Sequence, residues 1–297
     1  MKHLPTVKQL RYFVALEEHK HFGKAAQACF VTQSAFSVAI QELESLLNVS
    51  LVDRTNRSVT ITSIGAQIAS QARLALFDIE GIVDYANSLQ EPLSGPLKIG
   101  VIPTIAPFIL PKVLPLLRKQ FPKLNLYLKE DQTTRIHAAL LDGELDLLLL
   151  ALPFELSNVD TMSLFKDYFK LAYQKDTTKI VPQNYKPSKL DAENIILMED
   201  GHCLREHTLS ACKIRKQDQV NKFSANSLYT LVQMVDNDLG ITFLPEIALN
   251  CGLLNNTSVV VEDLSDRSYR TIGLAWRKSS MRKDEFKLLG DAIKSIM

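Results

Sequence analysis

The pattern of apolar residues changes at the segment Glu91-Pro-Leu-Ser-Gly-Pro96, and this change constrains the fold more than any other feature. Its prolines and glycine interrupt both helices and strands. Before the segment, apolar residues recur at helical spacing; after it, short apolar runs alternate with helical stretches. The 297 residues therefore predict at least two separately folded parts that join near residue 91.

The composition is that of an ordinary globular protein, with 46% hydrophobic and 23% charged residues. The net charge of +1 neither supports nor excludes a nucleic-acid partner. The longest apolar run, Leu145–Leu152, contains Asp146 and is too short to cross a bilayer. The first residues, Met1–Thr6, lack the apolar core of a signal peptide. We therefore expect a cytoplasmic protein whose four cysteines are reduced at rest.

Residues 7–47 have the pattern of three short helices. Thr6 and Thr32 are suited to cap the first and the third of them. The third helix has one apolar face and an opposite face of uncharged polar residues, namely Gln33, Ser34, Ser37 and Gln41. A short helix, a tight turn and a helix with a polar outer face predict a helix-turn-helix.

Two further elements follow this motif. Residues 51–62 contain two short β-prone runs around a basic turn, which predict a wing. From Ser63 to about Leu89 a helical pattern continues without proline. A long helix with no neighbouring helix in the sequence is expected to pair with a second copy of itself.

From residue 97 onward strand-like and helix-like stretches alternate, which predicts an α/β fold with mainly parallel sheets. About 200 residues exceed what one small sheet needs, so we expect two lobes. The strands are expected at residues 97–102, 124–129, 144–151, 169–173, 195–198, 222–224, 241–244 and 271–276, and the helices at 107–120, 133–143, 228–237 and 280–297.

Cys203 and Cys212 lie nine positions apart, and the first stands between His202 and Arg205. Neighbouring cations can hold a thiolate near neutral pH, and the thiolate is the nucleophilic form. A second cysteine can then resolve an oxidised first one. This pattern favours a reversible redox sensor over a structural disulfide in a cytoplasmic protein.

Other interpretations of these cysteines stay open. Cys203 can be a small buried hydrophobe, which is the usual state of a free cysteine. His202, Cys203, His207 and Cys212 can together bind zinc, although their spacing fits no common zinc pattern. Cys29 and Cys251 are expected to be packing residues.

The chain resembles the LysR-type transcriptional regulators over its whole length. The motifs that carry this resemblance in the first half are Leu10-Arg-Tyr-Phe-Val-Ala15, His21-Phe-Gly-Lys-Ala-Ala26, Val31-Thr-Gln-Ser34, Leu43-Glu44 and Asp53-Arg-Thr55. The second half is similar to the peroxide-sensing OxyR branch of this family, most specifically in the spacing of Cys203 and Cys212.

The resemblance implies three domains and an assembly. The domains are a winged helix-turn-helix at residues 1–62, a dimerising linker helix at 63–91 and a two-lobed sensor, similar to periplasmic binding proteins, at 92–297. Members of the family usually form tetramers. No cofactor or metal is implied.

The resemblance also assigns site residues. Thr104, Thr133, His202 and Arg270 would line a peroxide pocket, in which hydroxyls orient the peroxide and Arg270 stabilises developing negative charge. Helix capping after a strand would explain the two threonines equally well. Cys203 would be oxidised first, and Cys212 would then form a disulfide with it, which requires residues 204–211 to refold if they are helical.

The same resemblance assigns a DNA-reading face. The residues that would face the major groove are Thr32, Gln33, Ser34 and Ser37, and those that would hold phosphates are Lys24, Arg54 and Arg57. Gln41 and Glu42 stand where relatives commonly have basic residues, so base preference and phosphate contacts can depart from the family's. The alternative is a solvated helix face that binds nothing.

The leading functional hypothesis is a DNA-binding activator of oxidative-stress genes that senses hydrogen peroxide through Cys203 and Cys212. Its partners would be promoter DNA, further copies of the chain and RNA polymerase. The alternative within the same fold is a regulator that responds to a small anionic metabolite between the lobes. A thiol peroxidase is disfavoured, since an enzyme has no use for the amino-terminal motif.

Overall fold

The structure is a computed structural model that describes residues 3–54, 59–88, 91–179, 194–211, 222–264 and 267–297. Its contacts divide the chain into two compact units. The first comprises residues 1–87 with 141–143, and the second comprises residues 88–140 with 144–297. Within the described residues, no helix combines the length and the apolar character that crossing a membrane requires.

The first unit contains the expected helix-turn-helix. Helix α1 (Val7–His19) begins at a capping box, in which Thr6 accepts from the backbone of Gln9 and the Gln9 side chain accepts from that of Thr6. Helix α2 (Phe22–Ala28) is followed by helix α3 (Gln33–Leu47), which Thr32 caps as predicted. The three helices bury one apolar core that includes Phe13, Leu16, Ala25, Phe36 and Ile40.

A wing follows α3. Strands β1 (Val52–Arg54) and β2 (Val59–Ile61) pair in antiparallel register. The Glu44 carboxylate accepts hydrogen bonds from the backbone amides of Leu51 and Val52 at 2.7 and 3.2 Å, which ties α3 to the wing. Helix α4 (Ser63–Ser88) then matches the predicted linker helix.

The main sheet of the second unit has the strand order β10-β6-β11-β5-β3-β4, with β9 also paired to β6. Its strands are β3 (Gly95–Val101), β4 (Leu124–Glu130), β5 (Leu147–Leu152), β6 (Val159–Gln174), β9 (Thr242–Pro245), β10 (Val259–Asp263) and β11 (Tyr269–Arg277). Among the described strands of this sheet, only the pairings of β3 with β4 and with β5 are parallel. The prediction of mainly parallel sheets is therefore wrong, because β6 returns beside β11 and pairs with it, β9 and β10 in antiparallel register.

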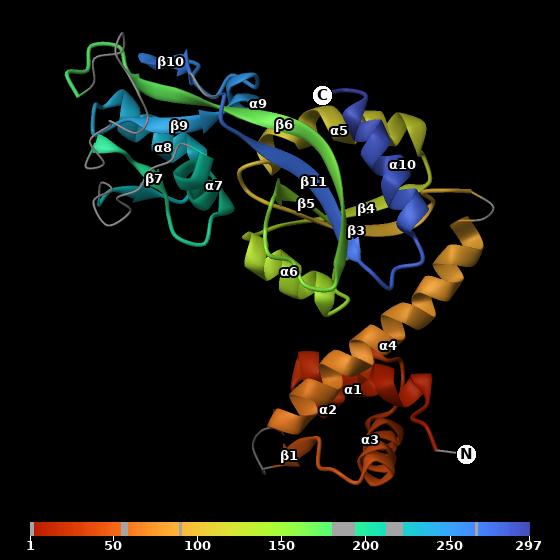
Figure 1. The fold of residues 1–297 in the computed structure, drawn as a ribbon. Coiled ribbons are helices and arrows are strands. Elements are labelled where there is room, and N and C mark those ends of the chain that lie inside the picture. The colour runs from red at the N-terminus through yellow and green to blue at the C-terminus, as the bar shows by residue number, and fades with distance from the viewer. Residues whose placement is uncertain (1–2, 55–58, 89–90, 180–193, 212–221, 265–266) are drawn as a thin grey trace. The chain divides into compact units, whose positions relative to one another are not determined.

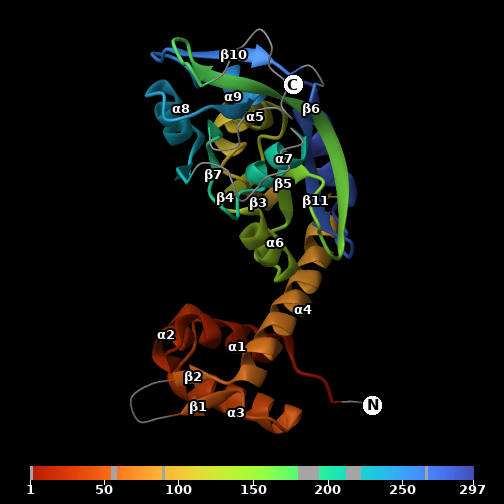
Figure 2. The same cartoon turned by 60° about the vertical axis from the view of Figure 1, so that its left-hand side comes forward.

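Strand β6 makes this domain two-lobed. Its first half pairs with β11 beside β5, and its second half pairs with β9 and β10 (Figures 1 and 2). The first lobe carries helices α5 (Ala106–Gln120), α6 (Thr133–Leu141) and α10 (Lys283–Lys294). The second lobe carries α7 (Cys203–Ala211), α8 (Leu228–Asp236), the short α9 (Glu246–Leu249) and the small sheet of β7 (Leu197–Met198) and β8 (Ser224–Ala225).

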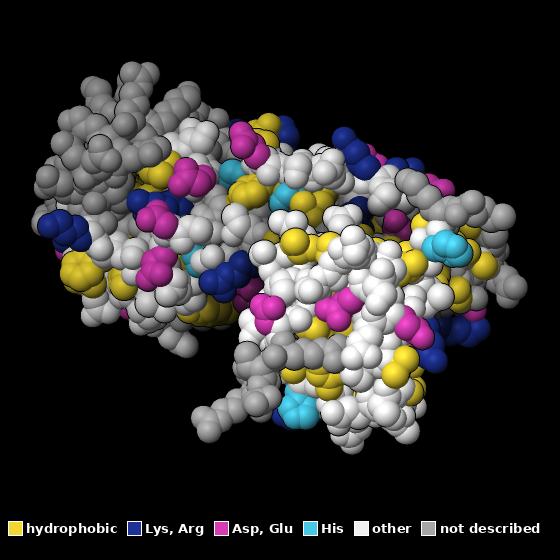
Figure 3. All heavy atoms as spheres, turned by 90° about the horizontal axis from the view of Figure 1, so that it is seen from below, with side chains coloured by type: hydrophobic (Ala, Val, Ile, Leu, Met, Phe, Trp, Pro, Cys, Tyr) yellow, Lys and Arg dark blue, Asp and Glu magenta, His cyan; other side chains and the backbone are white. Residues whose placement is uncertain are grey.

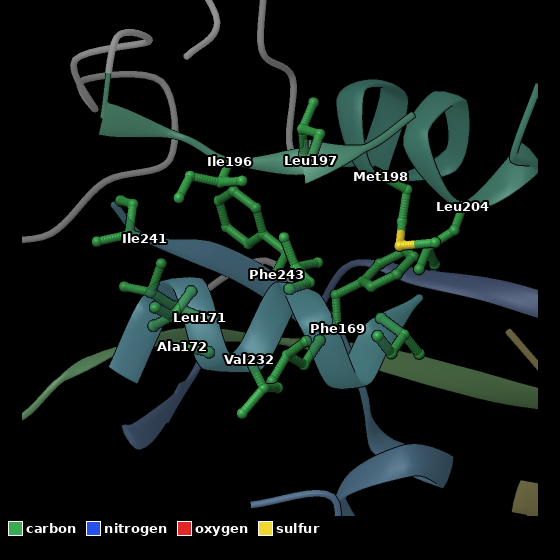
Figure 4. Close-up of a cluster of buried hydrophobic side chains, with 14 of the residues drawn as sticks. Phe169, Leu171, Ala172, Ile196, Leu197, Met198, Leu204, Val232, Ile241 and Phe243 are labelled. Carbon is green, nitrogen blue, oxygen red and sulfur yellow. The ribbon is translucent and has the colours of Figure 1, made fainter. Parts of the chain in front are cut away.

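The core of the second lobe fixes the position of α7. Leu204 and Leu209 of that helix are buried in a cluster with Met198, Phe169 and Phe243. Figure 4 shows Met198 and Leu204 pointing towards Phe169. Complete burial of one leucine side chain contributes about 1.5–3 kcal/mol. Packing of these two leucines therefore holds the helix that begins at Cys203.

Candidate redox site and DNA-reading face

Cys203 is the first residue of α7, and its side chain is only 5% exposed. A turn precedes it, in which the amide of His202 donates to the carbonyl of Glu199 at 3.3 Å. Gly201 in this turn has φ +90°, and a β-carbon there would lie 2.9 Å from Oε1 of Gln132. Only glycine fits this conformation without strain, so the backbone leading to Cys203 lies close against the start of α6.

Burial raises the pKa of the Cys203 thiol above its ordinary value, because a thiolate is poorly solvated there. The Thr133 hydroxyl, the charge of Arg270 and the amides of Cys203 and Ala151 act in the opposite direction. Burial has the larger effect, so this site holds a thiol rather than a preformed thiolate.

The flanking cation expected from the sequence is not Arg205. The Arg205 guanidinium bonds to the Asp200 carboxylate at 2.9 Å and to the Met198 carbonyl at 3.3 Å. Residues two apart on a helix point in nearly opposite directions, so Arg205 faces away from Cys203. The cation that lowers the pKa of Cys203 is Arg270, which is distant in the sequence.

Arg270 donates three hydrogen bonds to buried partners. Its Nε donates to Oδ2 of Asp167 at 2.8 Å, and the side chains of both residues are fully buried. Its Nη1 and Nη2 donate to the hydroxyl and the carbonyl oxygen of Thr104 at 2.9 and 3.0 Å. Strand β11 therefore links β6 to the loop after β3 through one side chain.

Asp167 lies directly across from Arg270 in the β6–β11 register. Burial raises the pKa of Asp167, while the Arg270 charge and the amide of Ile247, which donates at 3.0 Å, oppose that shift. The carboxylate thus accepts from both a guanidinium and a backbone amide. These bonds fix the guanidinium and leave it little freedom to move.

The two threonines differ in how their hydroxyls are used. Thr104 accepts from Arg270 and does not cap α5, whose N-cap is Ile105. Thr133 is buried, and its hydroxyl makes no hydrogen bond of normal geometry to a described residue. It nevertheless lowers the pKa of Cys203, so it is placed to donate to a sulfur anion. Helix capping explains neither hydroxyl.

The structure thus brings Thr133 and Arg270 to Cys203, and Thr104 joins them through Arg270. His202 is buried next to Cys203, but its imidazole makes no hydrogen bond to any residue that the structure describes. Cys212 lies outside the described residues. For the described part of the chain, no group of three or more histidine, cysteine or acidic side chains is placed to hold a metal ion.

His207 is a member of this site that the sequence indicated only through the zinc alternative. Its Nε2 lies 2.9 Å from the Pro153 carbonyl oxygen, and its Nδ1 is buried without a partner among the described residues. Because His207 lies four positions after Cys203, the two residues share one face of a helix, and this spacing could have indicated His207 from the sequence.

The remaining cysteines lie elsewhere. Cys29 is half-buried against the core of the first unit. Cys251 is largely exposed, and its thiol donates to the Phe108 carbonyl at 3.2 Å. The expectation that both are packing residues is therefore wrong for Cys251.

The residues expected to read DNA lie at the start of α3 and in α2. Gln33, Ser34 and Lys24 are exposed, while Ser37 is half-buried. The Thr32 hydroxyl accepts from the amide of Ala35 at 3.3 Å, so it also serves as the helix cap. Arg54 ends β1, but its side chain is not described, and Arg57 lies outside the described residues.

Within the described residues, the candidate DNA-reading face carries little positive charge. Helix α3 contains no lysine or arginine, and its Glu42 carboxylate accepts from the Gln9 amide at 3.4 Å. In the view of Figure 3, lysine and arginine side chains are scattered and form no single patch. Base reading at this face would therefore depend on uncharged groups.

Comparison with known proteins identifies the family. Residues 7–66 match the bacterial regulatory helix-turn-helix of the LysR family, and residues 90–296 match the LysR substrate-binding domain. The regulator EstR of Acinetobacter baylyi is 41% identical, with 100% of this chain and 98% of EstR covered. The dual regulator OxyR of Escherichia coli is 37% identical, with 98% of this chain and 95% of OxyR covered.

A solved structure gives the same result. A cysteine-to-serine variant of OxyR from Corynebacterium glutamicum, described as bound to hydrogen peroxide, superposes with a TM-score of 0.67. It is 31% identical and covers 100% of this chain and 94% of its own. The chain therefore belongs to the LysR family of bacterial transcription regulators, which bind DNA through the helix-turn-helix and are not enzymes.

Proposed function

We propose that this regulator senses hydrogen peroxide through reversible formation of a Cys203–Cys212 disulfide and controls oxidative-stress genes in response. The observation that carries the proposal is the buried Thr133 hydroxyl, which has no partner of normal geometry and lies beside the Cys203 thiol. A buried hydroxyl without a partner is costly, and a bound oxygen atom would satisfy it. Relatives that are named hydrogen peroxide-inducible genes activator or OxyR align with 98% of this chain.

The chemistry has two balanced steps. The Cys203 thiol gives up its proton, its sulfur attacks one peroxide oxygen, and the O–O bond breaks. The departing hydroxide takes up that proton, so the products are a sulfenic acid and water. The Cys212 thiol then attacks the sulfenic sulfur, and the products are a disulfide and water. Two electrons pass from the two sulfurs to the peroxide.

The pocket residues have separate roles in this proposal. The Thr133 hydroxyl donates to the thiolate or to the peroxide. The Thr104 hydroxyl accepts from Arg270, so its own proton is free to donate to a peroxide oxygen. The Arg270 charge stabilises the departing hydroxide, and buried donors of this kind are worth about 10²-fold or more in rate. His202 is retained as a pocket residue because it is buried beside Cys203.

The disulfide cannot form while α7 stays intact. The helix runs from Cys203 to Ala211, so its end Cα atoms lie about 12 Å apart. One further residue can return by at most about 3.8 Å. A disulfide requires Cα atoms within about 7 Å, so oxidation must unwind part of α7.

The remaining parts of the proposal concern assembly. We propose domain boundaries at residues 62/63 and 91/92, pairing of two chains through α4, and a cytoplasmic tetramer on promoter DNA that contacts RNA polymerase. Lys24, Arg54 and Arg57 would hold phosphates, and Thr32, Gln33, Ser34 and Ser37 would face base edges. Unwinding of α7 would change the spacing of the DNA-binding pairs, so footprints of the reduced and oxidised proteins should differ.

A second candidate is a LysR-type regulator that responds to a small anionic metabolite between its lobes. One observation favours it: the regulator EstR, whose name does not mention peroxide, is 41% identical to this chain, whereas the E. coli OxyR reported above is 37% identical. In that case the buried Cys203 would be a packing residue. The two candidates differ in what peroxide does to the chain.

The deciding experiment is mass mapping of the full chain after exposure to micromolar peroxide. We expect a Cys203–Cys212 disulfide in the wild type, no oxidation at that site in Cys203→Ser, and oxidation without an intramolecular disulfide in Cys212→Ser. Cys251→Ser should behave as the wild type. A wild-type protein whose Cys203 stays a thiol would exclude the peroxide function and leave the metabolite regulator.

A further inference from the structure

Helix α7 contacts the first lobe through His207 as well as through Cys203. The Nε2 of His207 lies 2.9 Å from the carbonyl oxygen of Pro153, the residue after β5. A carbonyl can only accept, so Nε2 carries a proton and donates. Because Cys203 lies one turn earlier on the same helix, this bond holds the cysteine helix against the strand whose Ala151 amide stabilises the Cys203 thiolate.

The same imidazole is left unsatisfied on its other side. Its Nδ1 is buried, and no described residue bonds to it. The charged groups that face it are Arg270 from β11 and Glu206 from its own helix. Burial lowers the pKa of His207, the Pro153 carbonyl raises it, and Arg270 lowers it further. The ring is therefore neutral in the reduced protein.

We propose that His207 is a positioning residue that latches α7 to the loop after β5, and that this latch must open before the Cys203–Cys212 disulfide can form. The inference rests on the proposed function, because the disulfide is what requires α7 to unwind. In the reduced state the imidazole donates to Pro153. In the unwound state it is free to enter solvent and to take up a proton.

The latch has a defined pH dependence. In solvent the imidazole has a pKa of about 6.5, whereas in the latched state its pKa is lowered. Between these two values the unwound state binds more protons than the latched state. A fall in pH through about 6.5 therefore favours unwinding, and a rise above it restores the full stability of the latch.

The first test measures hydrogen exchange of the α7 amides in the reduced full-length protein. His207→Ala removes the donor and leaves the Pro153 carbonyl without it, so exchange should accelerate about 2- to 10-fold. His207→Gln keeps an amide donor at similar reach and should exchange as the wild type does. Ser210→Ala, at an exposed position of the same helix, controls for side-chain truncation. Equal exchange in all four proteins would overturn the latch, whether or not the disulfide forms.

The second test measures the equilibrium between dithiol and disulfide in glutathione buffers, by thiol trapping and mass analysis. At pH 7.5, His207→Ala should shift it about 2- to 10-fold towards the disulfide, and His207→Gln should not. Between pH 7.5 and 5.5, the ratio of wild type to His207→Gln should move towards the disulfide by up to about 10-fold, since only histidine takes up the proton. A disulfide that forms in the wild type with no effect of either variant would overturn the latch alone. A wild type that forms no disulfide would instead overturn the proposed function.

Discussion

The guanidinium of Arg270 and the carboxylate of Asp167 face each other across the β6–β11 pairing and bond at 2.8 Å with both side chains fully buried. The pair stands at the point where the strand shared by the two lobes passes the Cys203 site. Removal of one member of a buried ion pair costs more than removal of both, because the remaining charge loses its partner.

Arg270→Met should lower the free energy of unfolding by about 3–5 kcal/mol, since Asp167 would remain buried without its cation. The double variant Arg270→Met, Asp167→Leu should recover most of this loss. Urea unfolding of the full chain measures both effects. The double variant should still react slowly with peroxide, because the charge that assists the departing hydroxide is gone. A single variant as stable as the wild type would contradict the assignment of an ionised pair.

Thr133→Val and Thr104→Val should both slow the oxidation of Cys203, but only Thr104→Val should also lower the free energy of unfolding. The Thr133 hydroxyl has no partner of normal geometry in the reduced protein, so its loss should leave stability unchanged or slightly higher and slow Cys203 oxidation about 10²-fold. Thr104→Val removes an acceptor from Arg270, so it should also lower the free energy of unfolding by about 1–3 kcal/mol. Stopped-flow oxidation and thermal unfolding of each variant give the two values. Identical profiles for the two variants would show that the two hydroxyls are not used differently.

Alkylation of Cys203 should be slow at neutral pH and should accelerate with pH, with its midpoint above about 8.5, because burial raises the pKa of this thiol. The raised pKa of Cys203 also makes the stability of the protein depend on pH. The folded protein holds the thiol proton more tightly than the unfolded chain, so this contribution is present below about pH 8.5 and is lost as the pH rises through the raised pKa. Iodoacetamide labelling in a Cys29→Ser, Cys212→Ser, Cys251→Ser background measures the midpoint. A midpoint below 7 would mean that Arg270 and Thr133 outweigh burial.

Specific DNA binding should depend on salt less steeply than is usual for a helix-turn-helix protein. Each phosphate contact contributes about 0.9 to the slope of log affinity against log salt, and α3 carries no cation. Lys24→Ala should reduce the slope by about 1 and weaken binding to all sequences alike. Gln33→Ala should change the preferred base and leave the slope unaltered. Titrations on matched and scrambled operators at several salt concentrations separate these outcomes, and equal slopes for Lys24→Ala and the wild type would exclude the phosphate role.

The features that could be predicted from the sequence are those with local causes. The helices of the first unit follow from the caps at Thr6 and Thr32 and from helical apolar spacing, and both caps are present. The residues that meet at Cys203 come from far apart in the chain, and one sequence alone carries no distances between them. Only the family resemblance pointed to Thr133 and Arg270.

The errors have local causes too. The first part of β6 contains the charged residues Asp160, Lys166 and Asp167 and no continuous apolar run, so the sequence predicts only a short strand at 169–173 and the wrong direction for the sheet. Strand β10 and helix α9 are short and were not predicted. Arg205 was expected beside Cys203 because it is near in sequence, whereas helix geometry turns it towards Asp200.

The continuity of β6 limits how a signal can travel through the sensor. Its sixteen residues give hydrogen bonds to both lobes, so the lobes share one backbone segment and cannot separate along it without breaking those bonds. The lobes can rotate by twisting β6 and β11, but a wide opening and closing motion would be costly. Oxidation of Cys203 should therefore act on the rest of the protein by changing the surface around α7. Mutations that stiffen β6 should leave the response to oxidation intact.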